Sequence, residues 1–211
     1  MPDDVATNGK ATPARSSRMP RDQRRLQLLD VAGRVFAERG YHNAAMDDIA
    51  EAAGVSKPVL YQHFPSKLDL YLALVDRACE EIVEIVRQAI AGSSSNSDRV
   101  EAALGSFYQF VAQSGRSFRF VFESDLTGDA TVQARIWKVH QDLAEAIGQT
   151  IAQDTGEAPD RARLLGISLV GLAQVGARYW VGTLRDQMTA EEASQLIATL
   201  AWRGMRSFPR V

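Results

Sequence analysis

Residues 57–67 carry the side chains whose types and spacing suggest a chemistry most clearly. The segment is KPVLYQHFPSK, and its polar groups are an ammonium, a phenol, a carboxamide, an imidazole and a second ammonium. Ammonium and carboxamide groups can bind base edges in the major groove of DNA, and all of these groups can hold phosphates. We therefore interpret this segment as a DNA-reading surface.

Each residue of the segment has an expected role. We expect Lys57 to reach a base edge, in particular guanine O6 and N7, because it is the exposed long side chain in the first helical turn. Pro58 and Val59 are expected to contact a thymine methyl group. The expected phosphate contacts are Tyr61, Gln62, His63 and Lys67. For Tyr61, packing against the following helix is the alternative.

Two short helices are predicted to position these side chains. Met46, Ile49, Ala50 and Ala53 repeat at the spacing of one apolar helix face. Gly54 is typical of a left-handed residue that ends a helix. A second helix then begins at about Ser56, a natural N-cap, with a proline tolerated in its first turn. Two short helices around a glycine-containing turn form a helix-turn-helix, whose second helix enters the major groove.

The surrounding sequence resembles the DNA-binding domain of the TetR family of bacterial repressors. The resemblance covers residues 22–82 and rests on LLDVAGRVFAERGYHNAAMDD followed by IAEAAGVSKPVLYQHFPSKLDLYLAL. The family usually has threonine where Ala45 and Met46 stand. Loss of that N-cap would cost roughly 1 kcal/mol, partly offset by Asp47 and Asp48 near the helix N-terminus.

This resemblance implies an all-α fold of about nine helices and a homodimer on a palindromic double-stranded operator. The expected domains are a disordered basic arm over residues 1–21, a helix-turn-helix domain over 22–82, and an effector-binding and dimerisation domain over 83–211. The implied function is transcription regulation in the cytoplasm, by default repression relieved by a small hydrophobic effector. Activation, or DNA binding without any effector, are the alternatives.

Charge is distributed as such a protein requires. Residues 10–77 contain 11 Lys and Arg against 8 Asp and Glu, whereas residues 78–211 contain 13 against 16. A basic head on an acidic body brings only one end of the chain to phosphate. Five arginines lie within eleven residues near the N-terminus, namely Arg15, Arg18, Arg21, Arg24 and Arg25. They predict an arm that follows phosphates or enters the minor groove, with a solvated tail as the alternative.

Long helices are predicted beyond the head. One begins at Ser66 and continues for roughly 25 residues, so it would span both halves of the chain. The next helix is expected to have Asp98 as its cap. Others are expected over residues 129–154 and 160–185, and a last one after the capping box that begins at Thr189. The run 164–182 is nearly all apolar, but Gln174, Arg178 and four glycines argue against a membrane span. By resemblance, the last two helices form the dimer interface through Leu165, Leu169, Leu172, Gly176, Leu196 and Leu200.

Aromatic residues suggest an effector pocket in the C-terminal half. The stretches FRFVFESDL and ARYW are similar to actinobacterial TetR-type regulators of fatty-acid synthesis, which sense long-chain acyl-CoA. The expected lining is Phe107, Phe110, Phe118, Phe122, Trp137 and Tyr179. Arg178, or else Arg116 or Arg119, would bind an anionic head group. Each aromatic residue taken alone is equally typical of a plain core, and Arg178 of an ordinary salt bridge.

Enzymatic motifs are missing from the sequence. The run GISLVG is one residue too long for a G-x-S-x-G nucleophile elbow. The three histidines have no metal-ligand spacing, and no glycine-rich phosphate loop occurs. Cys79 is the only cysteine, so we expect a reducing compartment and an inert thiol. We therefore expect no catalytic residues, metal or cofactor.

Overall fold

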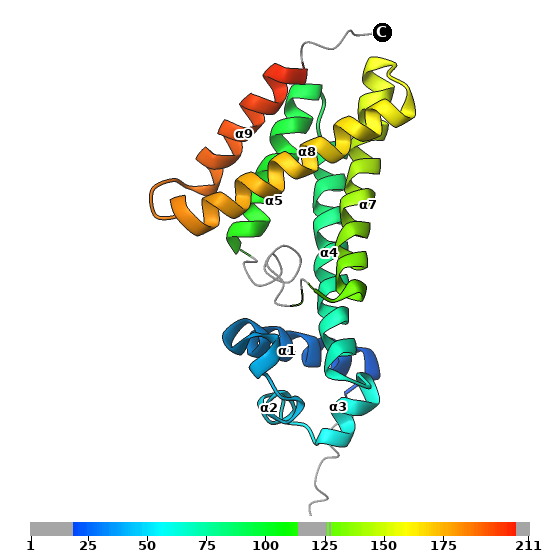
Figure 1. Ribbon diagram of the computed structural model, residues 1–211, viewed down its shortest axis with the longest axis vertical. Coiled ribbons are helices and arrows are strands. Elements are labelled where there is room, and N and C mark those ends of the chain that lie inside the picture. Colours follow the sequence, from blue (N-terminus) through cyan, green and yellow to red (C-terminus); the bar gives the residue numbers. More distant parts are fainter. Residues whose placement is uncertain (1–18, 114–125, 127, 206–211) are drawn as a thin grey trace, which may run out of the picture.

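The computed structural model describes residues 19–113, 126 and 128–205, and the secondary structure in these residues is helical throughout. There are eight α-helices and one π-helical turn in this part of the chain (Figure 1). Their bounds are α1 Arg21–Asn43, α2 Met46–Ala52, α3 Lys57–His63, α4 Lys67–Ala91, α5 Asn96–Gln113, α7 Ala130–Thr155, α8 Pro159–Tyr179, η1 Trp180–Leu184 and α9 Ala190–Met205. The predicted all-α class is confirmed, and α1 already begins at Arg21, inside the arm expected to be disordered.

Helices α1 to α3 and the first turns of α4 form a head at one end of the molecule (Figure 1). Its core contains Leu28, Ile49, Leu60 and Leu70, none of which is exposed to solvent. Gly54 has a φ of 64°, so it ends the first helix of the pair in the left-handed conformation that its sequence position predicts. Gly40 has a φ of 74° and kinks α1 three residues before its end.

At the start of α2, another residue partly replaces the threonine cap that is usual in the family. Ala45 occupies the N-cap position and has no side chain that could accept a hydrogen bond. Instead its own N–H donates to the Asp48 carboxylate at 3.2 Å, and Arg39 pairs with the same carboxylate at 2.8 Å. Asp48 therefore supplies half of a capping box, which is the compensation that the acidic first turn predicted.

Helix α4 runs from the head into the body, as predicted. Ser66 caps it by accepting a hydrogen bond from the Asp69 N–H at 3.0 Å. Its residues up to Val75 pack in the core of the head, and those from Ala78 onward pack in a second core that fills the body. Helix α7 lies alongside α4 (Figure 1). Because Val132 of α7 is buried in the core of the head, α7 also connects the two ends of the molecule.

Close contact between α7 and α8 depends on two glycines. A Cβ atom on Gly166 of α8 would lie 2.4 Å from the Ala144 carbonyl oxygen of α7. A Cβ atom on Gly148 would lie 3.1 Å from the Arg163 Cα. Between these helices, His140 Nε2 and Gln174 Oε1 are 2.7 Å apart. Gly166, one of the glycines of the apolar run 164–182, therefore serves a contact within the chain.

Two predicted helix ends need correction. Asp98 does not cap α5, because Ser95 does: the Ser95 hydroxyl accepts from the Asp98 N–H at 3.1 Å. The helix expected to reach Arg185 changes to a π-helical turn after Tyr179. There the Trp180 indole N–H donates to the Met188 carbonyl at 2.8 Å. The capping box of α9 forms as predicted, with the Thr189 N–H donating to Glu192 Oε2 at 2.8 Å and the Glu192 N–H to the Thr189 hydroxyl at 3.2 Å.

We expect Gly166→Ala to lower the free energy of unfolding by about 1–3 kcal/mol, because the new methyl group must push α8 away from α7. Gly105→Ala is the matched control, since a Cβ atom on Gly105 of α5 has nothing within 4 Å. That change should leave stability equal or raise it by up to about 1 kcal/mol through helix propensity. Urea unfolding at one fixed protein concentration measures both. Equal stability of the two variants would contradict the proposed importance of this close contact.

Candidate nucleic-acid interface and apolar cavity

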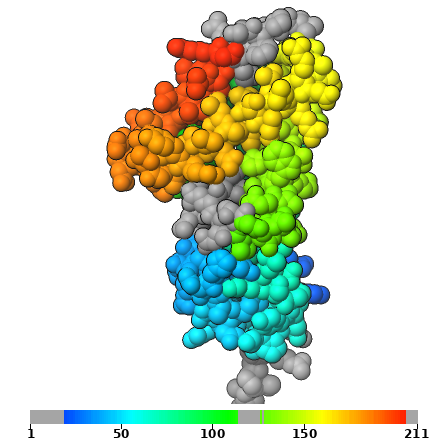
Figure 2. Space-filling view, viewed as in Figure 1, coloured from blue at the N-terminus to red at the C-terminus, as the bar shows by residue number. Residues whose placement is uncertain are grey.

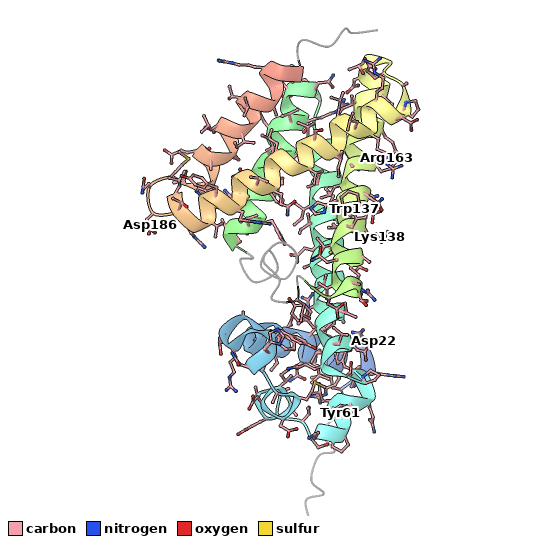
Figure 3. All side chains as sticks on the ribbon, viewed as in Figure 1. Asp22, Tyr61, Trp137, Lys138, Arg163 and Asp186 are labelled. Carbon is pink, nitrogen blue, oxygen red and sulfur yellow. The ribbon has the colours of Figure 1, made fainter. Side chains whose placement is uncertain are left out.

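The outer face of α3 lies at the end of the head farthest from the body. Tyr61 is 38% exposed and lies at that end in Figure 3. Lys57, Pro58 and Gln62 are exposed as well, whereas Leu60 beneath them is fully buried. The exposure of Tyr61 argues against the alternative in which it packs against α4. The predicted reading face is therefore available to a duplex.

Lys57 is held by an acidic neighbour on α2. Its ammonium nitrogen lies 2.8 Å from Asp47 Oδ1 and 3.1 Å from Asp47 Oδ2. This hydrogen bond raises the pKa of Lys57, which therefore stays charged. Both side chains are more than half exposed, so the pair is screened by solvent and can open readily. The predicted base contact therefore requires the Lys57–Asp47 pair to open.

Lys67 has a structural position that the sequence analysis did not foresee. Its ammonium group donates to the carbonyl oxygens of Tyr41 and Ala44, both at 2.9 Å, and lies 4.5 Å from the centre of the Tyr41 ring. These carbonyls belong to the kinked end of α1 and the link to α2. Lys67 thus ties this link to α4 through two of its ammonium N–H groups, and its expected phosphate contact stays a prediction.

Basic side chains from the start of α1 surround the end of α3. The Arg25 guanidinium lies 4.5 Å from the centre of the Phe64 ring, and Arg24 donates to the Gln27 carboxamide at 2.6 Å. Burial, followed by the charges of Arg21, Arg25 and Arg24, lowers the pKa of His63. His63 therefore contributes less positive charge than an unperturbed histidine, and the arginines supply most of the positive charge here.

The body contains an apolar cavity between α4, α5, α7, α8 and α9. The cavity has a volume of about 140 Å³. Its wall is mostly aliphatic, with one polar end. The lining residues are Val86, Ile90, Asn96, Arg99, Val100, Ala103, Leu104, Phe107, Leu143, Ile147, Thr150, Ile151, Asp154, Thr155, Leu169, Val170, Leu172, Ala173, Gln174, Ala201 and Trp202.

Most of the predicted effector residues lie elsewhere. Phe107 lines the cavity, but Phe110 is buried in the surrounding core without reaching it. Trp137 is 56% exposed on α7 (Figure 3), and Tyr179 is 60% exposed. Arg178 is exposed on α8 and does not reach the cavity. Phe118 and Phe122 lie outside the described residues.

The sequence did contain signals for the residues that line this cavity. Leu143, Ile147 and Ile151 repeat every four residues on α7, and all three line the cavity. Arg99 is the one basic residue of α5, and apolar residues follow it along the helix. Both signals are equally typical of a filled core, so neither identified a cavity.

An exposed apolar stripe runs over α8 and α9. It consists of Leu164, Val175, Tyr179, Leu196 and Leu200, each of which is at least 60% exposed. Figure 2 shows these two helices forming one face of the upper half of the molecule. We call this set the α8–α9 stripe. An apolar face of this kind suits a protein partner.

The predicted dimer residues therefore agree only in part with the exposed face of α8. Leu169 and Leu172 line the cavity, and a Cβ atom on Gly176 would lie 2.7 Å from the Tyr108 hydroxyl of the same chain. Leu165 is half-buried. Leu196 and Leu200 are exposed as expected. Leu164 and Val175, which lie on the free face of α8, each precede a predicted interface residue by one position.

The segment Pro159–Leu184 is long and apolar enough to cross a membrane, judged by length and composition alone. Only 22% of its most apolar stretch is buried within the chain. Its close contact with α7 and the continuation of its free face onto α9 suit a protein surface that meets another protein.

Other reactive groups offer no site. Within the described residues, no group of three or more His, Cys, Asp or Glu side chains could hold a metal ion. Burial, with smaller contributions from Asp76 and Glu80, raises the pKa of Cys79 to about 12. The thiol is therefore protonated at neutral pH, as expected of an inert cysteine.

These features define a DNA-binding transcription regulator of the helix-turn-helix class with an all-helical body. Residues 28–74 match the family described as bacterial regulatory proteins, tetR family. The chain is 40% identical over 195 residues to the HTH-type transcriptional activator FasR of Mycolicibacterium smegmatis, which covers 92% of this chain and 89% of that protein. The chain belongs to the TetR family, whose members regulate transcription and are not enzymes.

Solved structures share the fold. A TetR-like regulator from Rhodococcus sp. RHA1 matches 90% of this chain and 100% of its own, with 30% identity and a TM-score of 0.69. The regulator FadR of Bacillus subtilis, solved in complex with stearoyl-CoA, matches 83% of this chain and 96% of its own, with 18% identity and a TM-score of 0.70. At that identity the second likeness concerns the fold alone.

We expect Lys57→Ala to lose roughly tenfold or more of discrimination at a single operator position, because one base contact is removed. Asp47→Asn should instead tighten binding to all DNA, because it frees Lys57 and removes a negative charge near the phosphates. The matched control is Lys138→Ala, which breaks a similar exposed pair with Asp142 (2.8 Å) on α7, far from the head.

Fluorescence anisotropy against an operator selected from random DNA, and against each of its single-base variants, measures these effects. If Lys57→Ala weakened binding to every sequence equally, Lys57 would be a phosphate contact and not a base contact.

Proposed function

We propose that this protein is a ligand-responsive transcription regulator that binds a palindromic operator as a homodimer. Its proposed effector is a long-chain acyl-CoA or a similar lipid. The cavity is the observation that carries the proposal, because a largely aliphatic hollow with one polar end suits a long apolar chain with a polar head. A constitutive DNA-binding protein without an effector would have no need of such a hollow, so the cavity argues against that alternative.

One protein that shares the fold was solved with a ligand of this class, and one relative indicates the direction of control. The FadR structure of Bacillus subtilis contains stearoyl-CoA, and the name of FasR of Mycolicibacterium smegmatis describes a transcriptional activator. Similarity to an activator over 92% of the chain supports activation as the direction of control, in place of the repression that we expected. A bacterial regulator of this kind acts on the chromosome, and we therefore propose the cytoplasm as its location.

We propose that the α8–α9 stripe holds the two subunits together. Five large apolar side chains exposed on one face are costly in water and would be buried between two copies. An isologous dimer also gives the two heads the two-fold symmetry of a palindromic operator.

The proposed switch uses both helices that connect body and head. Val86 and Ile90 of α4, and Leu143 and Ile147 of α7, line the cavity, while α4 and Val132 of α7 also pack in the core of the head. A ligand that spreads α4 from α7 would change the separation of the two recognition helices, which must be about 34–36 Å for simultaneous binding. By reciprocity, operator DNA must change effector affinity by the same factor.

The first test blocks the cavity. Ala103→Trp places an indole where α5 lines the hollow, so palmitoyl-CoA should no longer bind or change operator affinity, while DNA binding itself is retained. Glu101→Trp, at an exposed position of the same helix, is the control and should respond like the wild type. Calorimetric titration of palmitoyl-CoA with and without operator measures both properties. Equal palmitoyl-CoA affinity with and without DNA would show that this ligand does not drive the switch.

The second test concerns the dimer. Leu164→Glu and Val175→Glu together should give monomers, because two unpaired charges would be buried in each half of the interface. Leu26→Glu changes a side chain of α1 that is 52% exposed and should leave the dimer intact. Light scattering after size-exclusion chromatography gives the mass directly. A double variant that stays dimeric would place the interface elsewhere.

A further inference from the structure

Arg99 lies between two adjoining hollows. The first is the apolar cavity described above. The second is an outer groove of about 410 Å³ along the far ends of α4 and α7, lined by Arg87, Ile90, Ala91, Arg99, Glu145, Ala146, Gln149, Thr150 and Gln153. Ile90, Arg99 and Thr150 line both hollows. These three residues therefore form the boundary at which an apolar interior meets a polar surface.

An ion pair spans this boundary. The Arg99 guanidinium donates through Nη1 to Asp154 Oδ2 and to Asn96 Oδ1, each at 2.8 Å. The two charged side chains are 30% and 27% exposed, so they are less screened than the exposed pairs elsewhere on this chain. The pair joins the start of α5 to the end of α7. Opening it would remove one contact from the boundary that the cavity and the outer groove share.

Besides the paired Arg99, the groove offers one guanidinium group, that of Arg87. Arg87 is exposed, and no carboxylate of the described residues lies within ion-pairing distance of it. Glu145, the one carboxylate in the lining, lies 3.7 Å from Arg163 and accepts a hydrogen bond from Gln149 at 2.9 Å. Within the described residues, Arg87 is therefore the guanidinium group of the groove that has no carboxylate partner, whereas Arg99 and Glu145 each have one.

This inference rests on the proposed function. We propose that the outer groove binds a phosphorylated head group and that the Arg99–Asp154 pair is a latch, an ion pair that opens when the head group binds. The acyl chain lies in the cavity, and the phosphates of the head draw Arg99 away from Asp154 and engage Arg87. Phosphate is a strong acceptor for guanidinium groups and can replace the carboxylate. A free fatty acid has no group that extends into the groove, so the site selects an acyl chain joined to a phosphorylated head.

The test compares palmitoyl-CoA, palmitate and CoA alone on the full-length dimer by calorimetry. Wild type should bind palmitoyl-CoA at least about tenfold more tightly than either part, since a hydrogen bond to a charged group contributes about that much. Arg87→Gln and Arg99→Gln should each lose about tenfold for palmitoyl-CoA and change palmitate affinity little. Asp154→Asn should gain affinity for palmitoyl-CoA, because the competing carboxylate is gone.

Arg161→Gln is the matched control. It breaks the Arg161–Glu157 pair (3.2 Å) at the same end of the molecule without touching either hollow, and palmitoyl-CoA affinity should stay unchanged. Arg87 is exposed, so its variant tests the groove even if Arg99→Gln does not fold.

The outcomes separate the two proposals. The latch is overturned if palmitate binds as tightly as palmitoyl-CoA, or if both arginine variants keep full palmitoyl-CoA affinity. The cavity proposal still stands in that case if Ala103→Trp abolishes binding. Failure of wild type to bind any of the three ligands overturns both proposals.

Discussion

The burial of one continuous helix in two hydrophobic cores is the constraint on which the rest of the structure depends. At 25 residues, α4 is about 37 Å long. Leu70 and Val75 are fully buried in the head, and Ile82 is almost fully buried in the body. Neither core can form without α4, and α4 has no glycine or proline at which it could bend between them. The position of the recognition helix is therefore tied to the packing of the body.

Regular periodicity and capping chemistry explain why so much of the fold could be predicted from sequence. The Ser66 cap, the Gly54 turn and the Thr189 capping box are local, because each needs only three or four neighbouring residues. Helix α4 followed from apolar spacing alone. Ser95 was missed as the cap of α5 because Asp98 and Ser95 are equally suitable in sequence, and only the backbone path decides between them.

The candidate sites were predicted less well, because they depend on which face of a helix meets which neighbour. Lys67 was exposed in the predicted pattern, yet the kink at Gly40 brings carbonyl oxygens toward it. Aromatic side chains fill space and thus mark a well-packed core. The cavity instead lies where small residues such as Ala103 and Ala173 leave room between helices. Leu169 and Val175 are both apolar on α8, and helix crossing alone decides which of them faces inward.

Signal transmission under the proposed mechanism is then a question of differential binding. A ligand shifts the position of the head only as far as it prefers one arrangement of α4 and α7 over another. The latch joins α5 to the end of α7 at the far side of the body, whereas Val132 anchors the start of α7 in the head. Opening the latch removes one of the contacts that hold the far end of α7, whereas the start of α7 stays anchored in the head. Residues 132–151 of α7 would then change their angle to the head. Helix α4 would have to follow, because it packs along α7 and belongs to both cores.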